Sequence, residues 1–156
     1  MIGAHGQIPW HIKADMQRFA ALTTGHAVIM GRKTFDSLPD SFKPLPNRKN
    51  IVVSRTVKNF AEYPKVEVWN SSQDCIAACR AGKIELPSNT VWIIGGGEIY
   101  SESMPFWDEL YLTLVHSKHE GDAFFPKFEQ QFRLEGEAVS GKSGNLRYSF
   151  LRYVRI

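Results

Sequence analysis

The sequence predicts a single α/β domain over residues 1–156, built on a mixed, mostly parallel central sheet with helices on both faces. Up to about residue 104, short apolar runs alternate with helix-like segments, a pattern typical of strands joined by helical crossovers. From residue 110 onward, strand-like segments follow one another without helices, which indicates strands paired by a hairpin. A length of 156 residues is enough to bury one core.

The expected elements follow from these runs and from the residues that bound them. A first helix opens in the segment 9–15, and further helices are expected at 32–38, from the capping residues 71–74 to about 81, and from 97 to about 104. Apolar runs predict buried strands at 27–30, 51–53, 66–69 and 91–94. Later strands are expected at 110–115, 132–139 and 146–156, the last two joined by a turn at 141–144.

Composition narrows the classes of function. A net charge of +3 is too small to indicate nucleic-acid binding, and no apolar run is long enough to cross a bilayer. The first residues show no secretory signal, and Cys75 and Cys79 are interpreted as packing residues of a helix. The five histidines are scattered, so we expect no metal site. We therefore expect a cytoplasmic, reduced and monomeric protein that acts on a small molecule, without nucleic acid or membrane.

Residues suited to anions follow three of the predicted strands, where open α/β sheets bind their ligands. They are Gly31-Arg32-Lys33-Thr34, Ser54-Arg55 and Gly95-Gly96-Gly97. Each segment taken alone also fits an ordinary strand end or a helix cap. Together they supply glycines for close backbone contact, and hydroxyl and guanidinium groups for phosphates. The sequence thus favours a pyrophosphate with an additional 2′-phosphate, that is, NADP rather than NAD.

One carboxylate is predicted to lie in an apolar helical stripe. The stripe has spacings of three, four and three, and consists of Ile12, Asp15, Phe19 and Leu22. Lys13, Gln17 and Arg18 are expected to point elsewhere. A carboxylate on such a face needs hydrogen-bond partners and is a candidate for proton transfer or for binding a cationic ligand. An acidic residue favoured by the helix dipole in a first turn would also explain Asp15, and spacing alone does not choose between the two.

Five motifs, in order along essentially the whole chain, carry a family resemblance. They are Ile8-Pro9-Trp10 with Asp15 and Phe19, Val28-Ile29-Met30-Gly31-Arg32-Lys33-Thr34, Leu45-Pro46-Asn47-Arg48-Lys49-Asn50, Ile94-Gly95-Gly96-Gly97-Glu98-Ile99-Tyr100, and Glu120-Gly121-Asp122. With them the chain resembles the dihydrofolate reductase family. The resemblance implies NADPH as cofactor and reduction of 7,8-dihydrofolate to 5,6,7,8-tetrahydrofolate, a reaction that serves one-carbon metabolism and thymidylate synthesis.

For the substrate, the resemblance implies roles at matching positions. Asp15 would hydrogen-bond the pterin ring and promote protonation of N5, Trp10 would help to order a water near the ring, and Thr113 would brace Asp15. Arg48 would bind the α-carboxylate of the glutamate tail, a task suited to a planar guanidinium. The other implied substrate positions are Ile8, Met16, Phe19, Leu38, Leu45, Ile94 and Tyr100.

For the cofactor, the resemblance implies phosphate and backbone contacts at the three strand ends. The implied phosphate-binding residues are Arg32, Lys33, Thr34, Ser54 and Arg55, with Gly96 and Gly97 at the diphosphate. Gly31, Gly95, Glu98 and Ile99 complete the implied cofactor site, and the family joins the first two glycines of this run by a cis peptide. Asp122 would steady a lid loop that runs from Gly3 to Ile8.

The start of the chain departs from the family. Members open with an apolar strand in the middle of the sheet, before the segment that matches Ile2-Gly3, and this strand is absent from the sequence. Its loss would leave two neighbouring strands with unpaired backbone groups, at about 1–3 kcal/mol for each buried group. We therefore expect an upstream start. A smaller departure is the longer loop 39–44 before Leu45, which borders the glutamate end of the implied site.

Three other interpretations are open from the sequence. A ribosylaminopyrimidine reductase of flavin synthesis would share the fold, but Asp15 and Arg48 fit a pterin with a glutamate tail better. A truncated nucleotide-binding module without turnover would fit the absent strand, but leaves Trp10, Asp15 and Thr113 unexplained. A structural α/β domain without ligands would leave the Asp15 stripe and the three anion-suited strand ends without a common cause.

Overall fold

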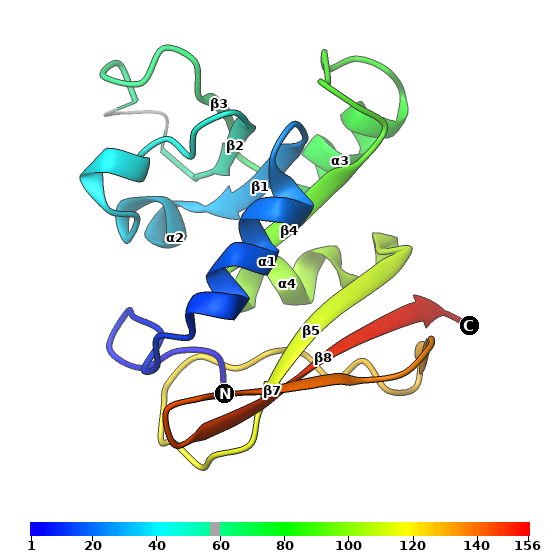
Figure 1. Ribbon diagram of the computed structural model, residues 1–156. Coiled ribbons are helices and arrows are strands. Elements are labelled where there is room, and N and C mark those ends of the chain that lie inside the picture. Colours follow the sequence, from blue (N-terminus) through cyan, green and yellow to red (C-terminus); the bar gives the residue numbers. More distant parts are fainter. Residues whose placement is uncertain (57–59) are drawn as a thin grey trace. The chain divides into compact units, whose positions relative to one another are not determined.

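The computed structural model describes residues 1–56 and 60–156 and confirms a mixed α/β fold with a parallel sheet (Figure 1). The chain forms two compact units. Unit 1 comprises Met1–Phe19 and Met104–Ile156, and unit 2 comprises Ala20–Ser103. Helix α1 (Lys13–Thr23) therefore begins in unit 1 and ends in unit 2. Each unit has its own four-stranded sheet.

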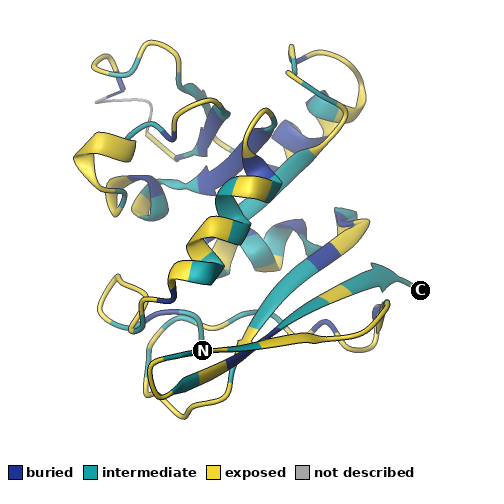
Figure 2. Cartoon of the chain, in the orientation of Figure 1, coloured by how far each residue is buried: buried dark blue, intermediate teal, exposed yellow. Residues whose placement is uncertain are grey.

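Unit 2 holds the parallel sheet, in the order β3-β2-β1-β4. Its strands are β1 (Ala27–Gly31), β2 (Lys49–Val53), β3 (Glu67–Trp69) and β4 (Val91–Gly95), at the positions of the four predicted apolar runs. All side chains from Ala27 to Met30 in β1 are fully buried, as the dark blue of the central strands in Figure 2 shows. Parallel strands are covered on both faces, which explains why they are continuous apolar runs rather than alternating ones.

The helices of unit 2 begin at the predicted positions. They are α2 (Arg32–Asp36), α3 (Ser72–Arg80) and α4 (Gly97–Ser103), with a 3-10 turn at Asp40–Phe42. The Ser71 hydroxyl caps α3 by accepting a 3.2 Å hydrogen bond from the Asp74 amide. α2 stops short of residue 38, because the Ser37 hydroxyl donates to the Thr34 carbonyl at its end. No helix in the described part of the chain is long and apolar enough to cross a membrane.

Unit 1 holds an antiparallel sheet whose long strand β8 pairs with each of the other three. The strands are β5 (Glu109–Val115), β6 (Phe132–Leu134), β7 (Val139–Ser143) and β8 (Leu146–Arg155), and a 3-10 turn, Met104–Phe106, precedes β5. Trp107, Phe128 and Phe132 are buried, and their rings pack with those of Phe125 and Tyr153. These aromatic contacts form the core of unit 1.

The hairpin near the C-terminus differs from the prediction. The strand expected at 132–139 is divided, because β6 ends at Leu134 and β7 starts only at Val139. The turn expected at 141–144 is shorter, since residues 141–143 belong to β7 and pair with β8. The turn itself is Gly144-Asn145. Gly141 and Ser143 are typical turn residues and led to the wrong prediction. They are nevertheless in a strand, because backbone pairing with β8 outweighs their weak strand propensity.

The predicted strands lie in two sheets, where one mixed sheet was expected. In the parallel sheet, β4 ends the order and pairs with β1 among the described strands. In the antiparallel sheet, β5 pairs with β8. β4 and β5 are thus edge strands among the described strands. Both are rich in apolar residues, a composition that is more typical of strands with two neighbours.

Candidate active site

Asp15 lies in the first turn of α1 and is held by a hydroxyl from a distant part of the sequence. Its Oδ1 accepts a 2.5 Å hydrogen bond from Oγ1 of Thr113 on β5. The carboxylate is half-buried, less enclosed than the apolar stripe predicted. A carboxylate that is oriented by a hydrogen bond and still reached by water can accept a proton or pair with a ring that donates hydrogen bonds.

Arg18, one turn further along α1, packs on the same sheet instead of pointing elsewhere as predicted. Its guanidinium carbon lies 4.5 Å from the centre of the Phe150 ring and 5.5 Å from that of Tyr111. Burial lowers the pKa of Arg18, while the charge of Asp15 and the Tyr111 hydroxyl act in the opposite direction. The prediction was wrong because an arginine side chain, with its three methylene groups, can lie along an apolar surface that its Cα does not face.

Large apolar side chains precede and follow Asp15 in the sequence, and two of them are exposed. Ile8 is 67% exposed and Met16 is 54% exposed, whereas Phe19 is half-buried. The half-buried ring of Trp10 meets His119 edge-on, with ring centres 4.9 Å apart. Large apolar side chains beside an oriented carboxylate suit a flat heteroaromatic ligand with a polar edge.

The loop that follows Gly3 is tied to residues 121–123. Gly3 forms a β-bridge to this segment, and the Asp122 carboxylate accepts a 3.3 Å hydrogen bond from the His5 amide. A Cβ on Gly121 would collide with the Gly3 carbonyl, so only glycine allows this close approach. No role was predicted for Gly121, because a glycine between two polar residues also fits an ordinary turn.

In unit 2, the three strand ends with anion-suited residues lie at one edge of the parallel sheet. In the pairing register, Gly31 stands opposite Val53, and Met30 stands opposite Gly95. Since the strands are parallel, their carboxyl ends meet at this edge, and Ser54 follows directly. The structure therefore brings together the three segments that the sequence singled out for phosphate binding.

The two arginines at this edge have polar partners in the structure. Nη1 of Arg32 donates a 3.0 Å hydrogen bond to the Thr56 hydroxyl. Nη2 of Arg55 lies 3.5 Å from Oε1 of Glu98, and both side chains are largely exposed, at 90% and 72%. Lys33 is exposed as well. The edge thus carries positive charge in contact with a carboxylate, with which an anionic ligand would compete.

The glycine run forms a tight link from β4 to α4. The Gly95–Gly96 peptide is cis, and Gly95 has a φ of 115°, which favours glycine. A Cβ on Gly95 would also lie 3.2 Å from the Tyr100 ring. A Cβ on Gly96 would lie 3.5 Å from the Thr34 hydroxyl, so the backbone here approaches α2 closely. Gly97 then opens α4.

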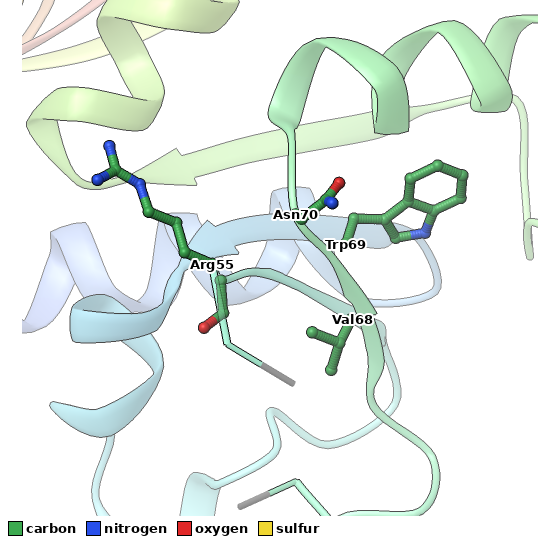
Figure 3. Close-up of a pocket in the computed structure, with 5 residues that line it drawn as sticks. Arg55, Val68, Trp69 and Asn70 are labelled. Carbon is green, nitrogen blue, oxygen red and sulfur yellow. The ribbon is translucent and has the colours of Figure 1, made fainter. Parts of the chain in front are cut away.

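A cavity of about 400 Å³ lies beside the end of β2 (Figure 3). It is lined by Ser54, Arg55, Val68, Trp69 and Asn70. In Figure 3 the Arg55 side chain extends away from Val68 and Trp69. Val68, Trp69 and Asn70 were not predicted as site residues. The sequence of a short strand does not indicate which of its side chains line a cavity.

Arg48 lies in the loop before β2 and donates to two oxygens. Nε bonds the Pro46 carbonyl at 2.9 Å, and Nη1 bonds the Thr23 hydroxyl at 3.0 Å. Thr23 is 1% exposed, and the burial around Arg48 lowers the pKa of its guanidinium. Asn50 shapes this loop by accepting from the Leu45 amide at 3.0 Å and donating back to the Leu45 carbonyl at 2.9 Å. Sequence reasoning missed Thr23 and Asn50, whose partners depend on loop geometry.

The predicted positions divide between the units. Trp10, Asp15 and Thr113 lie in unit 1, whereas Arg48 and the strand-end residues lie in unit 2. The other implied positions in unit 2 are half-buried Leu38, Ile94 and Tyr100, and buried Leu45 and Ile99. Within residues 1–56 and 60–156, no three His, Cys, Asp or Glu side chains are grouped so as to hold a metal ion.

Comparison with known proteins gives one consistent result. A family model described as dihydrofolate reductase matches residues 1–155. The dihydrofolate reductase of Neisseria meningitidis serogroup B is 42% identical over 99% of this chain and 90% of its own length. Those of Bacillus subtilis and Mycobacterium tuberculosis H37Rv are each 36% identical, over 98% and 99% of this chain and 86% and 91% of their own lengths. The chain therefore belongs to the dihydrofolate reductase family and is an oxidoreductase of that family.

Proposed function

We propose that this enzyme reduces 7,8-dihydrofolate with NADPH and one proton, giving 5,6,7,8-tetrahydrofolate and NADP⁺. The hydride would go to C6 of the pterin and the proton to N5. The observation that carries the proposal is the Asp15 carboxylate, oriented by Thr113 at 2.5 Å on a helix that also bears the accessible Met16 side chain. The tetrahydrofolate formed would supply one-carbon metabolism and thymidylate synthesis.

The carboxyl edge of the parallel sheet fits NADPH. Thr34 and Gly96 are close enough together to contact one diphosphate, and Arg32 and Lys33 are nearby in sequence. Beside Ser54 and Arg55, the cavity of about 400 Å³ can accept the adenosine end with its 2′-phosphate. Bound NADPH supplies the hydride, and the chain's own residues supply orientation and charge.

Asp15 would accept hydrogen bonds from the pterin ring and favour the protonated form of N5. Thr113 fixes the direction in which the carboxylate points, and Trp10 would help to hold a water beside the ring. A positioned acid or base typically contributes about 10²–10⁴-fold to a rate. The loop after Gly3, held by the contact between Asp122 and the His5 amide, would limit the access of bulk water.

Arg48 would bind the α-carboxylate of the glutamate tail. Its guanidinium is already oriented by the Pro46 carbonyl and the Thr23 hydroxyl, both of which are neutral. These two hydrogen bonds orient the guanidinium, whose planar fork suits a carboxylate. Ile8, Met16, Phe19, Leu38 and Leu45 would wall the pterin and benzoyl groups.

The test is a comparison of Asp15→Asn with Asp74→Asn, a matched change at an exposed site on α3. Turnover is followed by the loss of NADPH absorbance with dihydrofolate, and NADPH affinity by its fluorescence. We expect Asp15→Asn to lower kcat at least about 10²-fold and to change NADPH affinity less than about twofold. Asp74→Asn should behave as wild type. Near-normal turnover in Asp15→Asn would overturn the role given to this carboxylate.

A further inference from the structure

A second cavity of unit 2 lies beside Arg48, and none of its lining residues also lines the cavity at the end of β2. Its volume is about 420 Å³, which is within the range of about 300–1,000 Å³ that small-molecule sites have. It is lined by residues 44–48, by residue 50 and by Lys65. The cavity is thus formed by the loop before β2 together with one residue from the segment before β3.

The loop that lines this cavity is held in shape by hydrogen bonds. The side chain of Asn50 is 3% exposed and, besides its two bonds to Leu45, donates to the Arg48 carbonyl at 3.1 Å. At the tip of the loop, the Asn47 carbonyl accepts a 2.8 Å hydrogen bond from the Gly25 amide. A ligand that enters a cavity with such ordered walls spends little of its binding free energy on fixing the loop.

The charged residues that line this cavity are both cations. They are Arg48 and exposed Lys65, and no carboxylate lines it among the described residues. Glu67, which is close to Lys65 in the sequence, has other partners: its Oε1 lies 3.5 Å from Nζ of Lys49, and its Oε2 accepts from the Trp69 ring nitrogen at 2.7 Å. Two positive charges on one cavity favour a ligand that carries two negative charges.

We propose that this cavity binds the γ-carboxylate of the glutamate tail, and that Lys65 is the residue that recognises it. A glutamate attached through its nitrogen keeps two free carboxylates, which are joined by a short aliphatic chain. With the α-carboxylate on Arg48, the γ-carboxylate would enter the cavity that both cations line. An ammonium group on a flexible stem suits a carboxylate at the end of a flexible chain. The inference rests on the proposed function, in which Arg48 binds the α-carboxylate.

The test compares two ligands on four forms of the full chain. The ligands are dihydrofolate and its analogue with glutamine in place of glutamate, which lacks only the γ charge. Besides the wild type, Lys65→Met removes the charge, Lys65→Arg keeps it, and Lys83→Met removes the charge of another exposed lysine of unit 2. The Kd of each ligand is measured by quenching of protein fluorescence, at low and at high salt.

We expect the wild type to bind dihydrofolate about threefold more tightly than the glutamine analogue at low salt, and nearly equally at high salt, since Lys65 is exposed. Lys65→Met should bind both ligands equally, whereas Lys65→Arg and Lys83→Met should keep the preference. A wild type without preference, or a preference that persists in Lys65→Met, would overturn the inference. A structural effect of the substitution would weaken both ligands alike and leave the preference unchanged.

A second measurement separates this inference from the proposed function. The amide NMR shifts of Asn47 and Lys65 are followed while para-aminobenzoylglutamate, the tail without the pterin, is added to the wild type. Saturable shifts that are smaller with para-aminobenzoylglutamine would support the cavity as a γ-carboxylate site, even if the enzyme neither bound nor reduced dihydrofolate, a result that would refute the proposed function alone. Absent shifts, or equal shifts with inorganic phosphate, would overturn the inference.

Discussion

Replacement of Thr23 by valine tests whether the orientation of Arg48 matters for substrate binding. Valine has nearly the same shape but removes the hydroxyl that accepts from Nη1 of Arg48 at 3.0 Å. A hydrogen bond to a charged group contributes about 1.5–3 kcal/mol. Since Arg48 keeps its bond to the Pro46 carbonyl and is only half-buried, we expect the lower end of that range. About 1.4 kcal/mol corresponds to a tenfold weaker Kd for dihydrofolate.

The assay is quenching of protein fluorescence by dihydrofolate, with a dihydropterin that lacks the glutamate tail as the control ligand. Thr23→Val should weaken only the ligand that carries the carboxylate, whereas Thr23→Ser, which keeps the hydroxyl, should bind both nearly as wild type does. NADPH affinity should not change in either variant. Equal affinity of Thr23→Val and wild type for dihydrofolate would refute the reasoning, as would an equal loss for the tail-less ligand.

Two further predictions concern charge and burial. Glu98→Gln should strengthen NADPH binding about threefold at low salt, because the carboxylate that pairs with Arg55 is then removed. The gain in affinity should fade at high salt and be absent for NADH. Weaker binding of NADPH by the variant would contradict this prediction. Burial raises the pKa of the Cys75 thiol well above its ordinary value of 9.0, so the folded state keeps the thiol neutral where the unfolded chain ionises it. The free energy of unfolding should therefore fall as the pH rises above about 9, by at most about 1.4 kcal/mol per pH unit, and this part of the slope should vanish in urea titrations of Cys75→Ala.

The strands and helices of unit 2 could be predicted closely because local signals agree there. The run from Ala27 to Met30 is apolar at every position and completely buried, as a central parallel strand requires. Ser71 caps α3 through its hydroxyl, as its residue type indicates. The region of β6 and β7 could not be predicted so well, because residues 141–143 have turn-like composition and are strand only through pairing with β8.

The candidate site was predictable where a residue type and its position in an element carry the signal. Asp15 was found from helical spacing, and the three strand ends from the rule that ligands bind at carboxyl edges. Arg18, Thr23 and Trp69 were missed or misjudged, since their contacts are made with residues distant in sequence. Spacing along a helix gives the direction of each Cα–Cβ bond, but not the place where a long side chain ends.

Two threonine hydroxyls orient charged side chains of opposite sign. Thr113 donates its hydroxyl hydrogen to the Asp15 carboxylate, and Thr23 accepts from the Arg48 guanidinium. A hydroxyl can do either, because it carries one donor and two acceptor lone pairs. An oppositely charged partner would orient these groups as well, but it would also neutralise them and would have to be displaced by the ligand. A hydroxyl fixes the direction of the charged group without neutralising it, which is the kind of preorganisation that favours binding of a polar ligand.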